Sequence, residues 1–187
     1  MAFAEAIEEM GYELINGEEI MMSPAGRIHN KIQGNLFVLI GTFLKGKRCQ
    51  AFFETYVFLD EKNKFVPDIS IVCDPDKVSD RGIEGAPDFV AEVLSLSTQH
   101  KDKSAKKYAY EKFGVKEYWI IDPKARSIEV YLLGEDGKYI LDNVYQEYTE
   151  ADIFFVPENQ RDKYKLSLKL SLYEDLEIKL ADIFENA

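Results

Sequence analysis

Hydrophobic residues recur every three or four positions in one stretch of the chain, which is the spacing of one face of a helix. The residues concerned are Ile28, Ile32, Leu36, Leu39 and Phe43. They predict a helix over Gly26–Lys45. A second helix is expected to begin at Ser97 or Thr98, either of which can cap its start, and to reach Phe113, with Gly114 as its C-cap.

Strands are predicted where Phe, Tyr, Val and Ile dominate short runs between turn formers. Asn16-Gly17 within Tyr12–Met22 is a strong hairpin signal. Asp74–Pro87 is expected to be a long loop. The predicted strands are Arg48–Leu59 with a break near Glu54, Phe65–Cys73, Asp88–Ser95, Lys116–Ile121, Ser127–Leu133 and Lys138–Tyr145, with short strands near Ile153–Phe155 and Leu176–Ile178 before a terminal helix near Leu180–Phe184.

This order of elements predicts an α/β fold (α+β, with a mixed sheet), in which helices flank a central mixed β-sheet. The strand–helix–strand unit across Phe89–Ile121 is expected to join two parallel strands by a crossover. The length of 187 residues favours one domain over 1–187. The N-terminal hairpin, 12–22, and the C-terminal part, 150–187, are expected to be additions to its core.

Two acidic residues lie inside apolar runs of predicted strands. Alternation places Asp68 on a face with Ser70, and Glu92 between Val90 and Leu94. A carboxylate there is costly unless it is paired or binds a metal, and a divalent cation would relieve repulsion between two of them. The alternative is a salt bridge or hydrogen bond from each acid to a nearby group.

Lys106 is the lysine of the second helix that a helical wheel aims at the sheet, beside the apolar stripe of Ala105 and Ala109. It therefore points to the region expected for Glu92. The alternative is an i,i+4 pair with Asp102, in which the stem packs and the ammonium stays in water.

Composition narrows the partners and the location. The formal net charge of −11 argues against a generic electrostatic nucleic-acid binder, although it allows a nuclease with a local basic patch. Of the two cysteines, Cys73 lies in an apolar run and is expected to be a buried free thiol. No signal peptide and no membrane span is predicted, so we expect a cytoplasmic location.

Several motifs resemble those of one family. They are PDISIV from Pro67, AEVLSLST from Ala91, the spacing Asp102, Lys106, Tyr110, and GVKEYWIIDP from Gly114. Together they are similar to the Uma family, also called domain of unknown function 820, which is assigned to the PD-(D/E)xK restriction-endonuclease-like superfamily. The resemblance covers nearly the whole chain.

The resemblance implies a metal-dependent endonuclease with a restriction-endonuclease-like core. Asp68 and Glu92 would bind Mg²⁺ or Mn²⁺, and the carbonyl of Val93 could add a ligand. The standard motif has its lysine two residues after the acid, where this chain has Leu94. In the family the lysine is on the following helix, which makes Lys106 the third catalytic residue.

His29 and Glu54 are secondary candidates at the rim of the site. Nucleic acid is the expected partner, with DNA favoured, and superfamily habit together with the many Phe and Tyr residues suggests a homodimer. The alternative function is a catalytically degenerate nuclease fold that serves as a binding or oligomeric module. A third reading is an enzyme for a small phosphorylated substrate.

Overall fold

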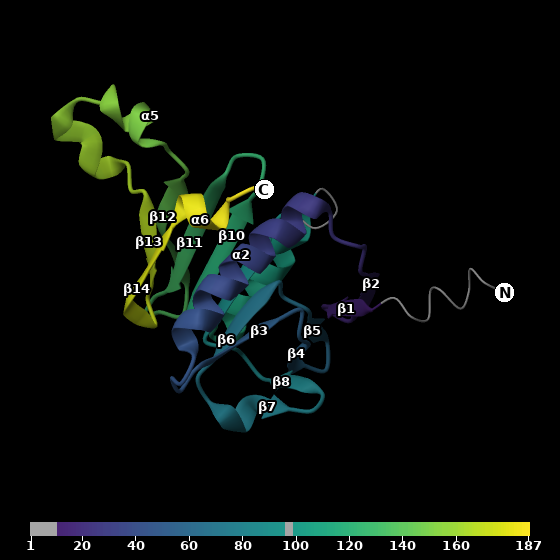
Figure 1. Ribbon diagram of the computed structural model, residues 1–187. Helices are drawn as coiled ribbons and strands as arrows, with labels where there is room; N and C mark the ends of the chain where they lie inside the picture. The colour runs from purple at the N-terminus through teal and green to yellow at the C-terminus, as the bar shows by residue number, and fades with distance from the viewer. Residues whose placement is uncertain (1–10, 96–98) are drawn as a thin grey trace.

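A mixed six-stranded sheet forms the centre of the computed structural model, which describes residues 11–95 and 99–187 (Figure 1). Its strand order is β12-β11-β10-β9-β6-β3. β9 and β10 are parallel, as the predicted crossover requires, and the other neighbours are antiparallel. The strands are β3 (Gln50–Phe53), β6 (Ile69–Val72), β9 (Phe89–Val93), β10 (Glu117–Asp122), β11 (Ser127–Leu133) and β12 (Tyr139–Gln146).

A second six-stranded sheet, ordered β2-β1-β5-β4-β8-β7, carries the N-terminal hairpin. Its strands are β1 (Tyr12–Ile15), β2 (Glu18–Met21), β4 (Val57–Asp60), β5 (Asn63–Phe65), β7 (Val78–Ser79) and β8 (Gly82–Glu84). The long loop expected over Asp74–Pro87 is thus partly wrong, because it contains the 3₁₀ turn η1 (Pro75–Lys77), β7 and β8. β8 pairs with β4, which fixes this segment to the sheet.

The helices follow the predicted order with one exception. Their bounds are α2 (Arg27–Leu44), α3 (Gln99–Lys101), the π-helical turn η2 (Asp102–Lys106), α4 (Lys107–Phe113), α5 (Glu150–Phe154), the 3₁₀ helix η3 (Glu158–Lys163) and α6 (Leu180–Ile183). A last hairpin pairs β13 (Ser167–Leu170) with β14 (Tyr173–Lys179). The predicted start of the second helix at Ser97 or Thr98 lies outside the described residues.

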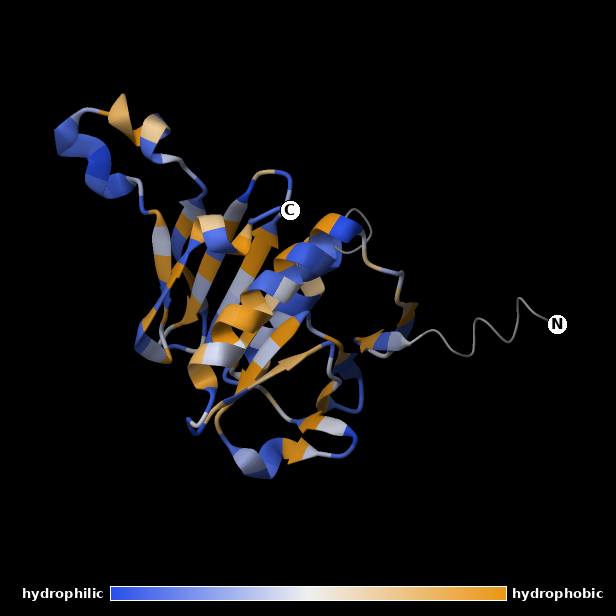
Figure 2. Cartoon of the chain, in the orientation of Figure 1, coloured by the Kyte–Doolittle hydropathy of each residue, from blue (hydrophilic) through white to orange (hydrophobic). Residues whose placement is uncertain are grey.

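The exception is the strand predicted over Ile153–Phe155, which is wrong, because α5 occupies that position. Thr149 and Asp152 form a capping box, in which each side chain bonds the backbone N–H of the other and stabilises a helix start. The segment projects from the body of the molecule (Figure 1). Two neighbouring apolar side chains, Phe154 and Phe155, are largely exposed there. Figure 2 shows hydrophobic and hydrophilic stretches side by side along this segment.

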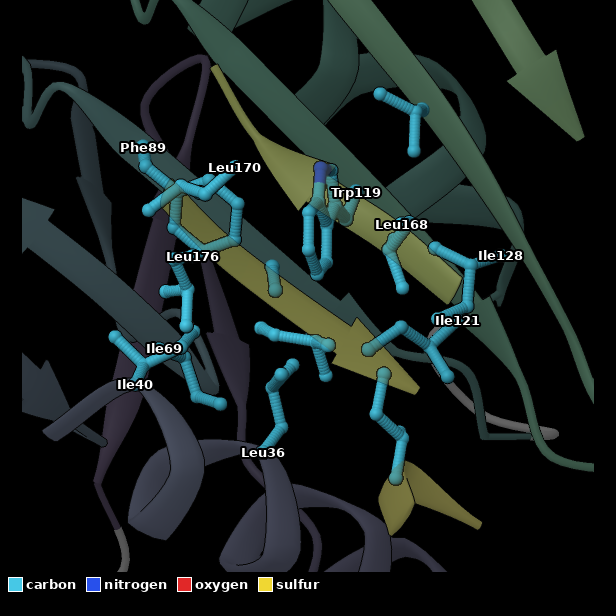
Figure 3. Packing of buried hydrophobic residues seen from close by; sticks show 14 of the residues in the cluster. Leu36, Ile40, Ile69, Phe89, Trp119, Ile121, Ile128, Leu168, Leu170 and Leu176 are labelled. Atoms are coloured by element: carbon cyan, nitrogen blue, oxygen red, sulfur yellow. The ribbon is translucent and has the colours of Figure 1, made fainter. Parts of the chain in front are cut away.

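Alternation along β9 divides its side chains between two cores. Phe89, Ala91 and Val93 belong to the larger core, which lies between the central sheet, α2 and the C-terminal hairpin (Figure 3). Phe89 meets Trp119 edge-on there, with ring centroids 5.0 Å apart. Val90 and Leu94 pack on the other side against α4. Glu92 shares that second side, as the alternation predicted.

The two cysteines form a disulfide between Cys49 and Cys73, so the free buried thiol expected at Cys73 is wrong. The antiparallel register that pairs Gln50 with Val72 brings the next two residues opposite each other. Stable disulfides are typical of oxidising compartments. The bond therefore does not favour the predicted cytoplasmic location. Among the described residues, no helix is both long and apolar enough to cross a membrane.

Candidate active site

Asp68 lies immediately before β6 and joins three elements through one oxygen. Its Oδ2 accepts a hydrogen bond from the backbone N–H of Val93 at 2.6 Å and lies 3.1 Å from Nε2 of His29. Pro67 precedes it and offers no N–H for sheet pairing, so the chain turns from β5 into β6 at this point. The contacts fix the Asp68 carboxylate between β9 and the start of α2.

Glu92 stands in the middle of β9 and is 3% exposed. Its Oε1 accepts hydrogen bonds from Nζ of Lys106 at 3.0 Å and from the hydroxyl of Tyr110 at 2.9 Å. Both donors come from the helical segment that covers this side of the sheet. The carboxylate is therefore held by charge-assisted hydrogen bonds, which are the strong kind.

Lys106 points at Glu92, which confirms the helical-wheel prediction of its direction. The pair with Asp102 is present as well, at 3.6 Å, but the expectation of a head group in water is wrong, because Lys106 is 3% exposed. Asp102 and Lys106 bound the π-helical turn η2, and both are buried. Single π-helical turns are rare in proteins overall, and those that occur are often located at functional sites.

Glu13 is a member of the site that the sequence analysis missed. Its carboxylate lies 2.7 Å from Nζ of Lys106 and also accepts the backbone N–H of Val66 at 2.9 Å. It comes from β1 of the N-terminal hairpin. One signal was available, because Glu13 alternates with the buried Ile15 and so shares its inward face.

Negative charge exceeds positive charge at this site. One ammonium, that of Lys106, faces three carboxylates within 4 Å. Burial opposes its charge, but the carboxylates prevail and raise the pKa of Lys106 well above its ordinary value. The pKa of Glu92 is also raised well above its ordinary value, because burial and the neighbouring acids outweigh the attraction of Lys106.

His29 and Glu54, the two secondary candidates, lie at the same site. The pKa of His29 is raised, because its hydrogen bond to Asp68 and the charge of that carboxylate outweigh the effect of burial, which favours the neutral ring. Glu54 is exposed, has a left-handed backbone with φ of 46°, and accepts a hydrogen bond from Nε2 of Gln33 at 3.3 Å. Gln33 also bonds the carbonyl of Asp68, at 3.1 Å.

A cavity of about 530 Å³ collects these groups, and Asp68, Glu92, Val93 and Lys106 all line it. Their sequence positions differ by up to 38 residues, yet β6, β9 and η2 bring them together. Asp68 Oδ1 and Glu92 Oε2 have no hydrogen-bond partner among the described residues. Each carboxylate thus keeps one oxygen for a ligand.

This donor set fits a hydrated Mg²⁺ or Mn²⁺ ion, which uses one or two carboxylates and several waters. The local excess of negative charge also favours binding of a cation. Within residues 11–95 and 99–187, no group of three or more His, Cys, Asp or Glu side chains is arranged to hold a metal ion. The site therefore fits an ion that keeps most of its water and does not resemble a closed protein cage.

Comparison with known proteins shows the family to which the chain belongs. The family model Uma2, described as "Putative restriction endonuclease", matches residues 3–161. The chain belongs to this family. It is 28% identical over 137 residues to an uncharacterized protein of Synechocystis sp., and the match covers 71% of each chain.

A crystal structure of a DUF820 protein has a similar fold. The crystal structure of a "putative nuclease belonging to DUF820" from Anabaena variabilis superposes with a TM-score of 0.70 at 23% identity, over 94% of this chain and 90% of the other. The Uma2 chain described here therefore has a restriction-endonuclease-like fold, as its sequence motifs predicted. The parallel pair β9–β10, with α3, η2 and α4 between its strands, is the part of that fold that carries Glu92 and Lys106.

Proposed function

We propose that this Uma2 protein is a metal-dependent endonuclease that hydrolyses phosphodiester bonds in nucleic acid, with DNA as the favoured substrate. Membership of the family and the restriction-endonuclease-like fold support the general class. One observation carries the proposal: Asp68 and Glu92 come from different strands, line one cavity, and each keep an oxygen with no partner among the described residues.

Asp68 and Glu92 would hold Mg²⁺ or Mn²⁺, and the carbonyl of Val93, which also lines the cavity, would be a further ligand. Such an ion, when bound, lowers the pKa of a coordinated water and stabilises negative charge on the phosphate. Hydrolysis of a phosphodiester adds one water to phosphorus and breaks one P–O bond. The products are a phosphate monoester on one fragment and a hydroxyl on the other.

The chain's own side chains hold the reacting groups in place. The Val93 N–H and His29 orient Asp68, while Tyr110 and Lys106 orient Glu92. Lys106 keeps a fixed positive charge because its pKa is raised. A fixed ammonium beside the cavity offsets the charge that develops on the phosphate oxygens, without reorganisation during the reaction.

Calorimetric titration with Mg²⁺ and Mn²⁺ tests the site. We expect binding to the wild type and none to Asp68→Ala/Glu92→Ala. The matched control, Glu174→Ala/Asp175→Ala, removes the same charge from an exposed position on β14 and should bind like the wild type. Equal binding by all three proteins would show that the ion binds elsewhere. The same proteins, incubated with DNA and RNA in either ion, test cleavage.

A second candidate function is a degenerate nuclease fold that binds without cleaving. The engagement of Lys106 by three buried carboxylates favours it, because such a network can persist as structure alone. Metal binding lost in the double variant, together with Asp68-dependent cleavage, would exclude this candidate. Absence of both would support it.

We also propose that the protein forms a homodimer. The support is exposed apolar surface on the edge strand β12, where Ile140 and Val144 lie, and on the projecting segment with Phe154 and Phe155. Exposed apolar patches often mark interaction surfaces. Sedimentation equilibrium should give twice the chain mass, and Phe154→Ser/Phe155→Ser should lower it to one chain if this segment forms the contact.

A further inference from the structure

The cavity that holds the carboxylates has a second, apolar wall. Ile20, Met21 and Met22 of the N-terminal hairpin, together with Tyr56, line the same space as Asp68 and Glu92. Met21 is 45% exposed although it is apolar, and Met22 and Tyr56 are half-buried. The hydrolysis of a phosphodiester uses none of these side chains, so the proposed function leaves this wall unexplained.

The wall is built by the fold and is held on several sides. The hairpin turn is tied to the β4–β5 turn by the Asn16 N–H on the Asn63 side chain at 3.1 Å and by the Gly17 N–H on the Lys62 carbonyl at 2.9 Å. Beyond β2, the Met22 N–H bonds the carbonyl of Gly11 at 3.1 Å. The apolar side chains and the carboxylates therefore line one cavity, and hydrogen bonds of the backbone hold its hairpin wall in place.

Few cationic side chains near the cavity are available to contact a substrate. Lys101 lines it, is half-buried, and has no ion-pair partner among the described residues. Lys106 is held by its three carboxylates. A duplex binder needs many phosphate contacts along its surface, and a chain of net charge −11 is poorly suited to supply them.

From these features we infer that the substrate is flexible single-stranded nucleic acid, with one nucleotide seated in the cavity and its base against Met22 and Tyr56. This inference rests on the proposed function, because it places the nucleotide's phosphodiester at Asp68 and Glu92. A volume of about 530 Å³ is that of a small-ligand site and suits one nucleotide unit. Bases of a single strand can splay out and stack on aromatic faces, whereas bases in a duplex are already stacked.

The contacts have separate roles in this arrangement. The Tyr56 ring has the Lys64 ammonium 4.7 Å from its centroid and the Phe58 ring 6.0 Å away, so a base would use its remaining face. The flexible thioether of Met22 adapts to bases of different shape. Lys101 contacts a phosphate oxygen. Such contacts bind a strand with little preference for sequence, since every base has an aromatic face.

Fluorescence polarisation of a labelled 12-nucleotide single strand and of the corresponding blunt duplex, both in Ca²⁺, tests the inference. A gel confirms that the strands remain intact. We expect the single strand to bind at least tenfold more tightly than the duplex. Tyr56→Ala and Met22→Ala should each weaken single-strand binding about tenfold, whereas Tyr56→Phe keeps the ring and should bind like the wild type.

Two controls separate these effects from general loss of surface. Val38→Ala removes an exposed apolar side chain from α2, and its affinity should equal that of the wild type. Lys101→Ala should weaken binding and Lys101→Arg should restore it, whereas Lys169→Ala, an exposed lysine on β13, should have no effect. Thermal melts establish that each variant is folded.

The inference and the proposed function can fail separately. Equal or tighter binding of the duplex, or unchanged single-strand binding by the folded Tyr56→Ala and Met22→Ala variants, overturns the inference, even if Asp68-dependent cleavage of duplex DNA is found. Tyr56-dependent preference for the single strand without any cleavage in Mg²⁺ or Mn²⁺ supports the inference and contradicts the proposed nuclease activity.

Discussion

Replacing Lys106 by methionine tests whether its ammonium balances the carboxylates of the site. Methionine keeps a flexible apolar stem of similar length and removes only the charge. In the native protein the ammonium lies 2.7 Å from Glu13, 3.0 Å from Glu92 and 3.6 Å from Asp102, and it is 3% exposed. The variant would leave three buried acids without their shared cation.

Removing one partner of a buried ion pair costs about 3–5 kcal/mol. We therefore expect Lys106→Met to lose about that much of the free energy of unfolding. The loss is a large share of the roughly 5–15 kcal/mol that stabilises a typical domain. At about 2–4 °C per kcal/mol for a chain of this size, the melting temperature should fall by roughly 10 °C.

The loss should depend on pH in a defined direction. The pKa of Glu92 is already raised in the fold, so the native state holds this proton more strongly than the unfolded chain does. A raised acid contributes stability below its unfolded pKa, about 4.3, and loses it as the pH rises through the folded pKa. Without Lys106 the pKa rises further. The destabilisation should therefore be smallest near pH 4.5 and largest near pH 8.

Urea denaturation of wild type and variant at these two pH values measures the free energies of unfolding. Lys103→Met is the matched control, because Lys103 also forms an ion pair, with Glu129 at 2.6 Å, but is 43% exposed. Exposed pairs contribute about 1 kcal/mol or less. If Lys106→Met cost no more than Lys103→Met, or if its cost did not grow with pH, the view of Lys106 as the charge that balances the site would be refuted.

Further predictions concern other parts of the molecule. Glu92→Gln should abolish cleavage and raise the melting temperature of the metal-free protein, because the carboxylates of Asp68 and Glu92 would no longer repel each other. A lower melting temperature would show that the Glu92 carboxylate stabilises the fold through its salt bridge. Tyr110→Phe removes one hydrogen bond to that carboxylate and should lower the free energy of unfolding by roughly 1.5–3 kcal/mol in urea titrations, whereas Tyr108→Phe, at an exposed position of α4, should be neutral. Cys49→Ser/Cys73→Ser opens a loop whose ends are separated by 24 residues and should cost roughly 3 kcal/mol, measured against the oxidised wild type; an equal melting temperature with and without reductant would show that the thiols are not bonded in solution.

Local patterns were sufficient to predict most elements. The apolar repeat gave α2 within one residue at each end, and Gly114 ends α4 in a left-handed conformation, with φ of 85°, as the C-cap prediction requires. The break expected near Glu54 separates β3 from β4. The strand expected over Ile153–Phe155 failed because the capping box at Thr149 was not recognised, although it is a local signal.

The sequence by itself determined which acids are unusual and which lysine faces them. Asp68 and Glu92 stand in apolar runs, and the helical period aims Lys106 at the sheet, so each of these inferences depends on near neighbours in the chain. Tertiary structure alone decided the remainder. Glu13 reaches Lys106 from a hairpin 93 residues earlier, Cys49 meets Cys73 through a strand register, and Met22 and Tyr56 line the same cavity as the carboxylates. These contacts depend on how separate sheets and helices pack, and no periodicity within one segment encodes that packing.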